Sequence, residues 1–145
     1  MATTTTNFAW DIPTSSDLVK NGATAIAELG QDIDTKLAGL TVNAQTGTTY
    51  TAVKADGLNA IVTMDNASAN TFYIPTDATY NFPTGTTLLV YQKGAGITTI
   101  NAVTSGTTTI NSAGAVAAAP VLARYKSAAC IKVAANSWIV VGAIA

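Results

Sequence analysis

The sequence predicts a mainly β protein with a single helix near its N-terminus. From Tyr50 onward, short runs of strand-forming residues alternate with Gly, Pro, Asn and Asp at intervals of about ten residues, which is typical of an antiparallel β-sandwich or barrel. Before that region, apolar residues recur at seven-residue spacing, which indicates an amphipathic helix. We therefore expect an extended leader (residues 1–16), an amphipathic helix (17–40) and a β body that forms a knob (41–145).

Charged residues are scarce in this chain. They make up 10% of the 145 residues, whereas the apolar fraction is an ordinary 48%. A typical globular protein is about one-quarter charged. A surface of Thr, Asn and Ser side chains would keep such a chain soluble, and so would coverage of much of its surface by identical copies. We expect the second arrangement, in which the chain is part of a homo-oligomer.

Net charge and the first residues restrict the partners. The formal net charge is −1 and the cations are scattered, so we expect no nucleic-acid partner. No window approaches the roughly 18 consecutive apolar residues of a membrane helix, so we expect no membrane insertion. The start, Met1–Thr6, lacks the cationic and apolar regions of a secretion signal. These features predict a protein that is made and assembled in a cytoplasm.

The leader carries three large apolar side chains at alternating positions. Phe8, Trp10 and Ile12 are separated by small or polar residues, as in an extended segment that lays one face into a groove of a partner. The alternative is that these side chains fold back on the protein's own body. We expect them to anchor the chain to a partner.

The helix should begin near Thr14–Asp17, which supplies hydroxyl caps and an anion at the positive end of the helix dipole. Its apolar positions then follow a heptad-like pattern. This stripe makes the helix a candidate for a trimeric coiled coil, although a stripe at this spacing can also pack on the protein's own body. The positions that we expect to face other copies are Val19, Ile26, Leu29, Ile33, Leu37 and Leu40.

Nine segments of the β body read as strands. Two of them, Leu88–Tyr91 and Trp138–Val141, are apolar on both faces. One face of a small antiparallel body normally meets water, so a doubly apolar strand predicts a second buried surface, most simply a subunit interface. The expected strands are 50–54, 58–64, 71–74, 86–92, 97–103, 107–111, 121–125, 129–134 and 138–143.

Residues that could carry catalysis are few. The chain has no His and a single Cys, Cys130, which removes the commonest general base and most zinc sites. The acidic residues of the β body, Asp56, Asp65 and Asp77, each stand at a predicted turn, where Asp is common for backbone reasons. We therefore expect no enzymatic activity, no metal and no cofactor.

Two features of the β body suggest ligand binding. Tyr80 and Phe82 flank a predicted loop and are the candidates for facing a ligand such as a glycan, with burial in the core or an interface as the alternative. Beyond Asp77 the chain has no acidic residue and four basic ones, Lys93, Arg124, Lys126 and Lys132. Such a mildly basic end would suit anionic glycans or lipids, but four charges over this length are also an ordinary surface.

Several stretches resemble parts of tailed-bacteriophage virion proteins. The segment Asn7–Pro13, with Asp17–Val19 and Gly22–Asp34 after it, resembles the N-terminal segment of many phage minor structural and fibre proteins. A module at the C-terminal ends of phage fibre proteins is similar to Ile61–Thr71, Ile74–Pro75, Phe82–Thr86, Gly94–Gly96 and Trp138–Gly142. Fibre proteins often carry a long shaft between these two ends, whereas this chain has only the helix.

The resemblance implies a component of the virion surface. It implies a short homotrimeric fibre, attached through its N-terminus to capsid or tail proteins, whose β knob points outward and attaches to a host surface, with a host glycan as a candidate partner. It carries over no catalytic residues. Two other functions remain open: a capsid decoration protein that stabilises the head without binding a host, and a carbohydrate-binding adhesin module.

Overall fold

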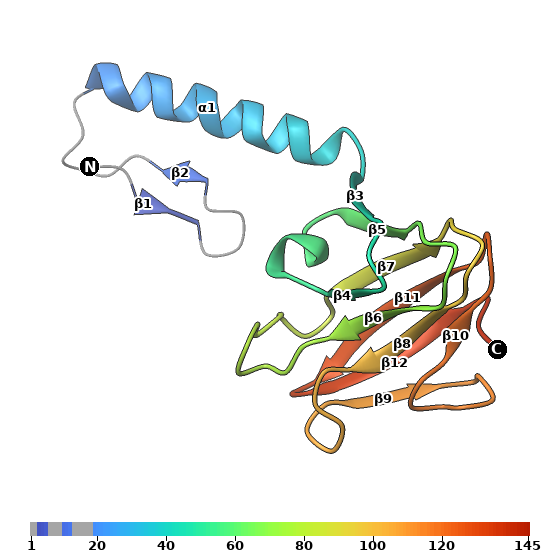
Figure 1. The fold of residues 1–145 in the computed structure, drawn as a ribbon. Helices are drawn as coiled ribbons and strands as arrows, with labels where there is room; N and C mark the ends of the chain where they lie inside the picture. Colours follow the sequence, from blue (N-terminus) through green and yellow to red (C-terminus); the bar gives the residue numbers. More distant parts are fainter. Residues whose placement is uncertain (1–2, 6–9, 13–18) are drawn as a thin grey trace. The chain divides into compact units, whose positions relative to one another are not determined.

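The computed structural model describes residues 3–5, 10–12 and 19–145. The chain divides into two compact units, Met1–Thr41 and Val42–Ala145, which are described separately below (Figure 1). Phe8 and the predicted helix cap at 14–17 lie outside the described residues.

The described leader residues form a small hairpin. Strand β1 (Thr3–Thr4) pairs antiparallel with β2 (Asp11–Ile12). Next to this pair, the Thr5 amide donates to the Trp10 carbonyl at 2.9 Å, and the Trp10 amide donates to Thr5 Oγ1 at 3.0 Å. The described parts of the leader thus pair with each other, which the expectation of a single extended segment did not include.

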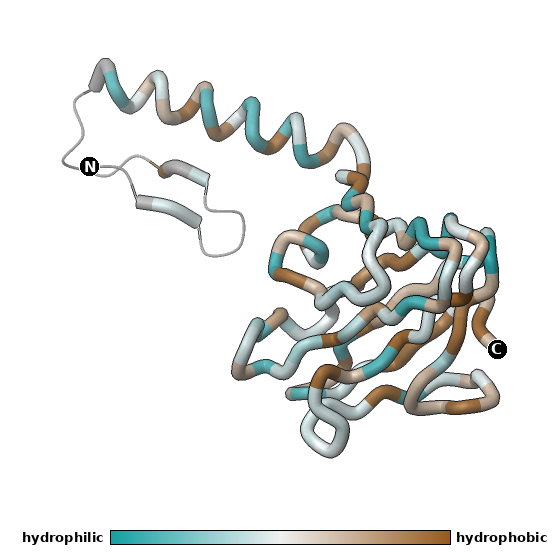
Figure 2. Tube along the Cα trace, viewed as in Figure 1, coloured by the Kyte–Doolittle hydropathy of each residue, from teal (hydrophilic) through white to brown (hydrophobic). Residues whose placement is uncertain are grey.

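Helix α1 (Val19–Leu37) follows the leader, and β2 packs against it. Along the helix, polar and apolar residues recur at about the spacing of the helical turns (Figure 2). We expected the helix to reach residue 40, but it ends at Leu37. The Ala38 amide still donates to the Asp34 carbonyl at 2.9 Å. Gly39 follows, a residue type that commonly ends helices, and β3 begins at Thr41.

The β body contains two sheets and one short 3₁₀ helix, η1 (Lys54–Gly57). The six-stranded sheet has the spatial order β3 (Thr41–Gln45), β5 (Ala60–Met64), β7 (Thr87–Gln92), β11 (Ser127–Ala134), β12 (Ser137–Gly142) and β9 (Thr109–Ser112). The four-stranded sheet has the order β10 (Val121–Leu122), β8 (Thr98–Ala102), β6 (Asn70–Ile74) and β4 (Thr49–Thr51). Each expected strand overlaps one of these, and β3 is a strand that we did not expect.

The antiparallel arrangement that we predicted is wrong, because both sheets are mixed. From β3 to β11 the chain crosses to the other sheet after every strand. A strand that returns to its own sheet by way of the other sheet runs in its original direction, so β5 and β7 pair in parallel, as do β4 and β6, and β6 and β8. Strands β9 and β12 are also parallel. Antiparallel pairs join β7 to β11, β11 to β12 and β8 to β10.

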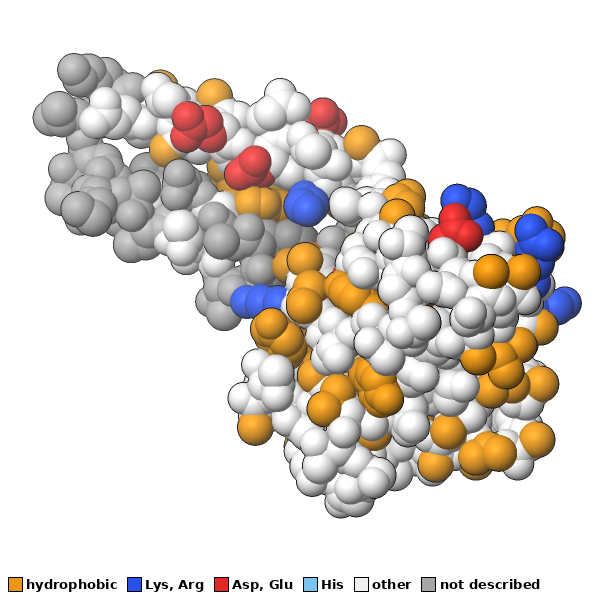
Figure 3. Space-filling view, viewed as in Figure 1, with side chains coloured by type: hydrophobic (Ala, Val, Ile, Leu, Met, Phe, Trp, Pro, Cys, Tyr) orange, Lys and Arg blue, Asp and Glu red, His pale blue; other side chains and the backbone are white. Residues whose placement is uncertain are grey.

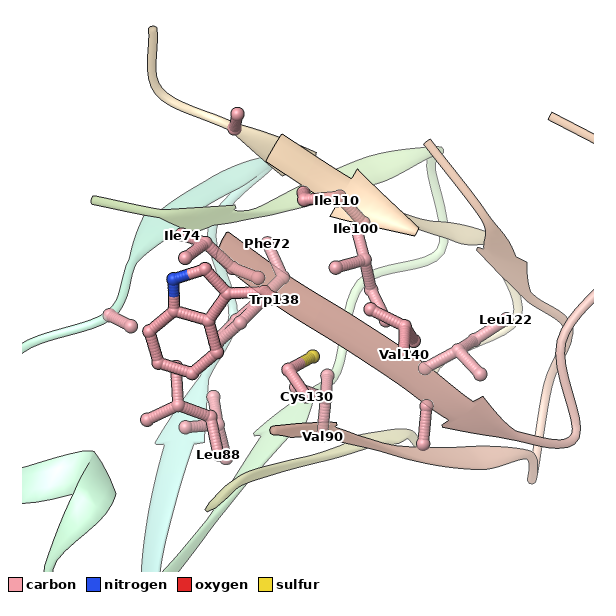
Figure 4. Close-up of a cluster of buried hydrophobic side chains, with 14 of the residues drawn as sticks. Phe72, Ile74, Leu88, Val90, Ile100, Ile110, Leu122, Cys130, Trp138 and Val140 are labelled. Carbon is pink, nitrogen blue, oxygen red and sulfur yellow. The ribbon is translucent and has the colours of Figure 1, made fainter. Parts of the chain in front are cut away.

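The two sheets enclose one hydrophobic core. Burial alternates along each central strand: in β5, for example, Ala60, Val62 and Met64 are buried while the residues between them are half-buried. Phe72 and Ile100 from the four-stranded sheet lie in the same cluster as Val90 and Trp138 from the six-stranded sheet (Figure 4). The inner face of each sheet therefore packs on the inner face of the other, and the outer faces are left for other contacts.

Candidate functional site

The first candidate site residues are the acidic groups of the β body, and the structure gives each of them a structural partner. Asp56 is 2% exposed and accepts hydrogen bonds from Asn43 Nδ2 (2.7 Å), the Tyr50 hydroxyl (2.8 Å) and the Val53 amide (2.8 Å). Burial, and next the hydrogen bond to Asp56, raise the pKa of Tyr50 to about 12. This network fixes η1 against β3 and β4.

Asp77 pairs with a buried lysine. Lys132 is 2% exposed, and its Nζ lies 2.6 Å from Asp77 Oδ1 while it donates to the Phe82 carbonyl at 2.7 Å. Asp77 Oδ2 also accepts the Asn136 amide at 3.0 Å, and Asn136 Oδ1 accepts the Asp77 amide at 2.8 Å. The pair therefore fastens the loop after β6 to the β11–β12 hairpin.

The two other candidate groups of the β body, Asp65 and Cys130, also lie in structural rather than reactive surroundings. Asp65 forms a 2.7 Å ion pair with Lys93 at the surface, and the hydrogen bond that Lys93 donates to the Asp65 carboxylate raises the pKa of Lys93. Cys130 is fully buried, and burial raises the pKa of its thiol to about 12. The thiol is therefore protonated at neutral pH, and Cys130 is a core residue. Within the described ranges, no cluster of Cys, Asp and Glu is arranged to hold a metal ion. None of the described helical segments combines the length and apolarity that a bilayer crossing requires.

Of the two aromatic side chains that we predicted to face a ligand, only one is exposed. Tyr80 is 37% exposed, but Phe82 is 3% exposed and belongs to the core. The Phe82 ring meets Trp138 edge-on, with 5.7 Å between ring centroids. Phe82 is therefore corrected from a ligand candidate to a core residue. The buried Lys132 donates to the Phe82 carbonyl, and this hydrogen bond holds the backbone of the loop at Phe82 against the core.

The predicted anchoring and oligomer residues of the first unit are partly described. Trp10 and Ile12 are half-buried. On α1, Leu29 is half-buried, and Val19 lies in the helix with its side chain outside the description. The other stripe residues are exposed in the single chain: Ile26 (62%), Ile33 (37%), Leu37 (79%) and Leu40 (48%).

The outer face of the six-stranded sheet carries a set of apolar side chains that the core does not use. Strand register places Ile61, Leu89, Ala129 and Val141 in one row across β5, β7, β11 and β12. A second row aligns Ile131 of β11 with Ile139 of β12. These outward side chains are half-buried or exposed, with Val141 at 48%. We call this surface the apolar sheet face; its residues are Ile61, Leu89, Ala129, Ile131, Ile139 and Val141.

Two shallow hollows lie along this face. One of about 530 Å³ is lined by residues of β9 and β12, including Ile139, and one of about 350 Å³ is lined by residues of β5, β7 and β11, including Ile61 and Leu89. Both include Val141 and Gly142, so they meet at the end of β12. A Cβ on Gly142 would lie 2.5 Å from the Ser127 carbonyl oxygen. This glycine therefore allows β12 to lie close to β11 and leaves the hollow open.

The sequence indicated part of this face and missed the rest. Leu89, Ile139 and Val141 belong to the strands that read as apolar on both faces. Ile61, Ala129 and Ile131 were not singled out, because only the strand order places them beside Leu89 and Val141. The sequence did contain a pattern that could have identified Ala129 and Ile131, because residues 128–131, Ala-Ala-Cys-Ile, are also apolar on both faces of the strand.

Comparison of the chain with protein-family models, with curated proteins and with solved structures gave no match.

Proposed function

We propose that this chain is a non-enzymatic structural component of a bacteriophage particle. It forms a short homotrimeric fibre at the virion surface, whose N-terminal leader binds other virion proteins and whose β body is a sandwich displayed for attachment to a host. The observation that carries this proposal is the apolar sheet face, which is uncovered in the single chain.

The apolar sheet face has the composition of a subunit interface. Exposed contiguous apolar surface on a small protein marks an interaction site, and the interfaces of obligate oligomers resemble a protein core cut in half. The face contains no charged residue among its six members. Identical copies are the simplest occupants, because coverage by other copies is one way to keep a chain with only 10% charged residues soluble.

The helix supplies a second surface of the same kind. Ile26 and Ile33 are seven residues apart on α1, Leu40 continues this spacing just after the helix, and the three side chains are between 37% and 62% exposed. Such a stripe gains stability when two further copies cover it in a coiled coil. The glycines at positions 22 and 30 weaken an isolated helix by about 1 kcal/mol each, so association also supports the helix itself.

The first test is the absolute mass of the purified protein by light scattering. A homotrimer has three times the 14.7 kDa chain mass. The variant Leu89→Lys places a charge in the middle of the apolar sheet face, and we expect it to lower the mass to that of one chain or to weaken the trimer at least tenfold. Thr99→Lys is the matched control, because Thr99 lies half-buried on the outer face of the other sheet. A folded monomeric wild-type protein would refute the trimer.

The second test concerns the particle. Particles assembled without this protein should keep intact heads and lose adsorption to the host if the chain is an attachment fibre. Fragile heads with normal adsorption would instead assign it to capsid decoration. Particles that never contain the chain would remove the virion proposal altogether.

A further inference from the structure

Three loops lie side by side at one end of the β body. Strands β3, β5 and β7 all run toward this end: the Asp65 amide donates to the Gln45 carbonyl at 2.7 Å, and the Lys93 amide donates to the Met64 carbonyl at 2.8 Å. The Tyr125 amide donates to the Gln92 carbonyl at 2.7 Å, which adds a third loop. We call this end the tip; it comprises residues 65–69, 93–97 and 123–126.

A network of buried polar side chains holds the 93–97 loop of the tip in place. Gln92, Thr98 and Asn70 are at most 3% exposed. The Thr98 hydroxyl donates to Asn70 Oδ1 at 2.6 Å and contacts Gln92 Oε1, while Gln92 Nε2 donates to the carbonyls of Gly94 (3.0 Å) and Gly96 (2.7 Å). A buried, satisfied polar network of this kind fixes the loops that it joins.

Tyr125 is displayed on the tip in an unfavourable backbone conformation. Its φ is 62° and its side chain is 61% exposed. The Lys126 amide donates to the Ala123 carbonyl at 3.1 Å, so Tyr125 stands at the third position of a β-turn, where a positive φ normally selects Gly or Asn. The other non-glycine residues with positive φ in the described chain are both Asn, Asn59 and Asn136. Strained residues of this kind cluster at functional sites.

Positive charge gathers around this tyrosine. The Arg124 guanidinium carbon lies 4.6 Å from the centre of the Tyr125 ring. No acidic residue follows Asp77 in the chain. Of the four later cations, Lys132 is buried against Asp77, and the other three, Lys93, Arg124 and Lys126, are all exposed at the tip. Asp65 offsets one of them, and basic side chains accordingly crowd one end of the body in Figure 3.

We propose that the tip binds an acidic polysaccharide. The electron-rich face of an exposed tyrosine ring suits the C–H face of a sugar, and guanidinium and ammonium groups pair with carboxylate or sulfate groups of the same polymer. The tip lacks the long row of phosphate-binding cations that nucleic acids require. This inference rests on the proposed function only for the source of the polymer, which would be a host surface.

The test measures binding of the full-length protein to polygalacturonate, a carboxylate-bearing polysaccharide, against neutral dextran, by calorimetry. We expect at least tenfold preference for polygalacturonate. Arg124→Ala and Tyr125→Gly should each weaken it at least tenfold, whereas Tyr125→Phe should retain it. Tyr125→Gly should melt at the same or a higher temperature than wild type, because glycine relieves the positive φ. A loss of binding without a loss of stability separates a ligand contact from a structural role.

Lys54→Ala is the matched control, since Lys54 is an exposed cation of η1 that lies outside the tip, and its removal should leave binding unchanged. Equal affinity for dextran and polygalacturonate, or full affinity in Tyr125→Gly, would overturn the proposal. Polyglutamate bound as tightly as polygalacturonate would also overturn it, and would assign the tip to an acidic protein partner. The light-scattering mass of each variant shows whether the oligomer is intact, so a failure of this proposal is distinguishable from a failure of the trimer.

Discussion

At the scale of single residues, the buried ionisable side chains of Asp56 and Lys132 hold loops of the β body. Asp56 is buried with three donors around it, and Lys132 is buried with the Asp77 carboxylate and the Phe82 carbonyl as acceptors. A buried charge without such partners would cost several kcal/mol. This chain has few charged residues, but the buried ones have structural roles. Asp56 fixes the position of η1, and the pair of Lys132 and Asp77 fixes the loop after β6.

The first residue-scale prediction concerns Tyr50. Its pKa is raised to about 12 by burial and by Asp56, whereas an unfolded tyrosine titrates near pH 10. The unfolded state therefore loses its proton first, and the free energy of unfolding should fall as pH rises from about 10 to about 12. The loss should be about 1–2 kcal/mol after allowance for solvent screening.

Tyr50→Phe isolates this contribution. The variant has no phenol to titrate, so its stability should fall less steeply than that of wild type in the same pH window. At neutral pH it should be less stable by about 1–3 kcal/mol, because Asp56 loses one buried donor. Denaturant unfolding at a series of pH values gives both numbers. Identical slopes for the variant and wild type would mean that Tyr50 is not the titrating group.

At the scale of elements, glycine has opposite effects in the helix and in the turn after β7. A Cβ added to Gly22 in α1 would meet nothing within 4 Å, whereas one added to Gly94 would lie 2.2 Å from the Asn66 carbonyl oxygen. The helix therefore contains glycine without any steric need for it in the single chain. The turn after β7 requires glycine, because the backbones of the 65–69 and 93–97 loops touch there.

This contrast predicts opposite outcomes for one substitution. Gly22→Ala should raise stability by about 0.5–1 kcal/mol and increase helical content. Gly94→Ala should lower the free energy of unfolding by about 1–3 kcal/mol through overpacking. Circular dichroism during thermal and denaturant unfolding measures both effects. A neutral Gly94→Ala variant would contradict the close approach of the two loops.

At the scale of the whole molecule, the chain combines a first unit that contains the leader and α1 with a β body that has two differently used ends. One end of the body lies at the start of β3, where the chain enters from Thr41. The tip lies at the other end of that strand. In the proposed fibre, the end at which β3 begins is the end that directly follows the first unit in the chain, and the tip is the end that we propose to be displayed.

The whole-molecule prediction is a truncation. If the proposed fibre is right, removal of residues 1–16 should abolish incorporation into particles and leave the soluble oligomer intact, because the surfaces that we propose for oligomer contacts lie in α1 and on the apolar sheet face. Incorporation is measured by the protein content of purified particles, and the oligomer by light scattering. A truncated protein that is unfolded or monomeric would show that the leader does more than anchor the chain.

Local chemistry in the sequence was enough to locate most elements. Hydrophobic periodicity and turn residues identified α1 and the strands from β4 to β12 within a few residues, because both signals act over short stretches of chain. Strand β3 was missed because Thr41–Gln45 directly follows the helix with a polar, weakly alternating pattern. The doubly apolar strands do place apolar side chains outside the core, since alternation of side chains between two faces is a property of any strand. The subunit interface that we expected on this surface stays a prediction.

The tertiary structure decided which strands are neighbours and which loops meet. Nothing in the sequence indicated that the chain crosses between two sheets after each strand, and this crossing makes the sheets mixed and brings Ile61, Leu89 and Ala129 into one row. The same crossing placed Phe82 inside, through a contact with Lys132 fifty residues away in the sequence, and gathered Lys93 and Arg124 at one tip. Long-range pairing depends on the combined packing of many residues, so no local pattern specifies it. The sequence by itself determined the elements and the scarcity of reactive groups, and only the fold determined the surfaces that they form.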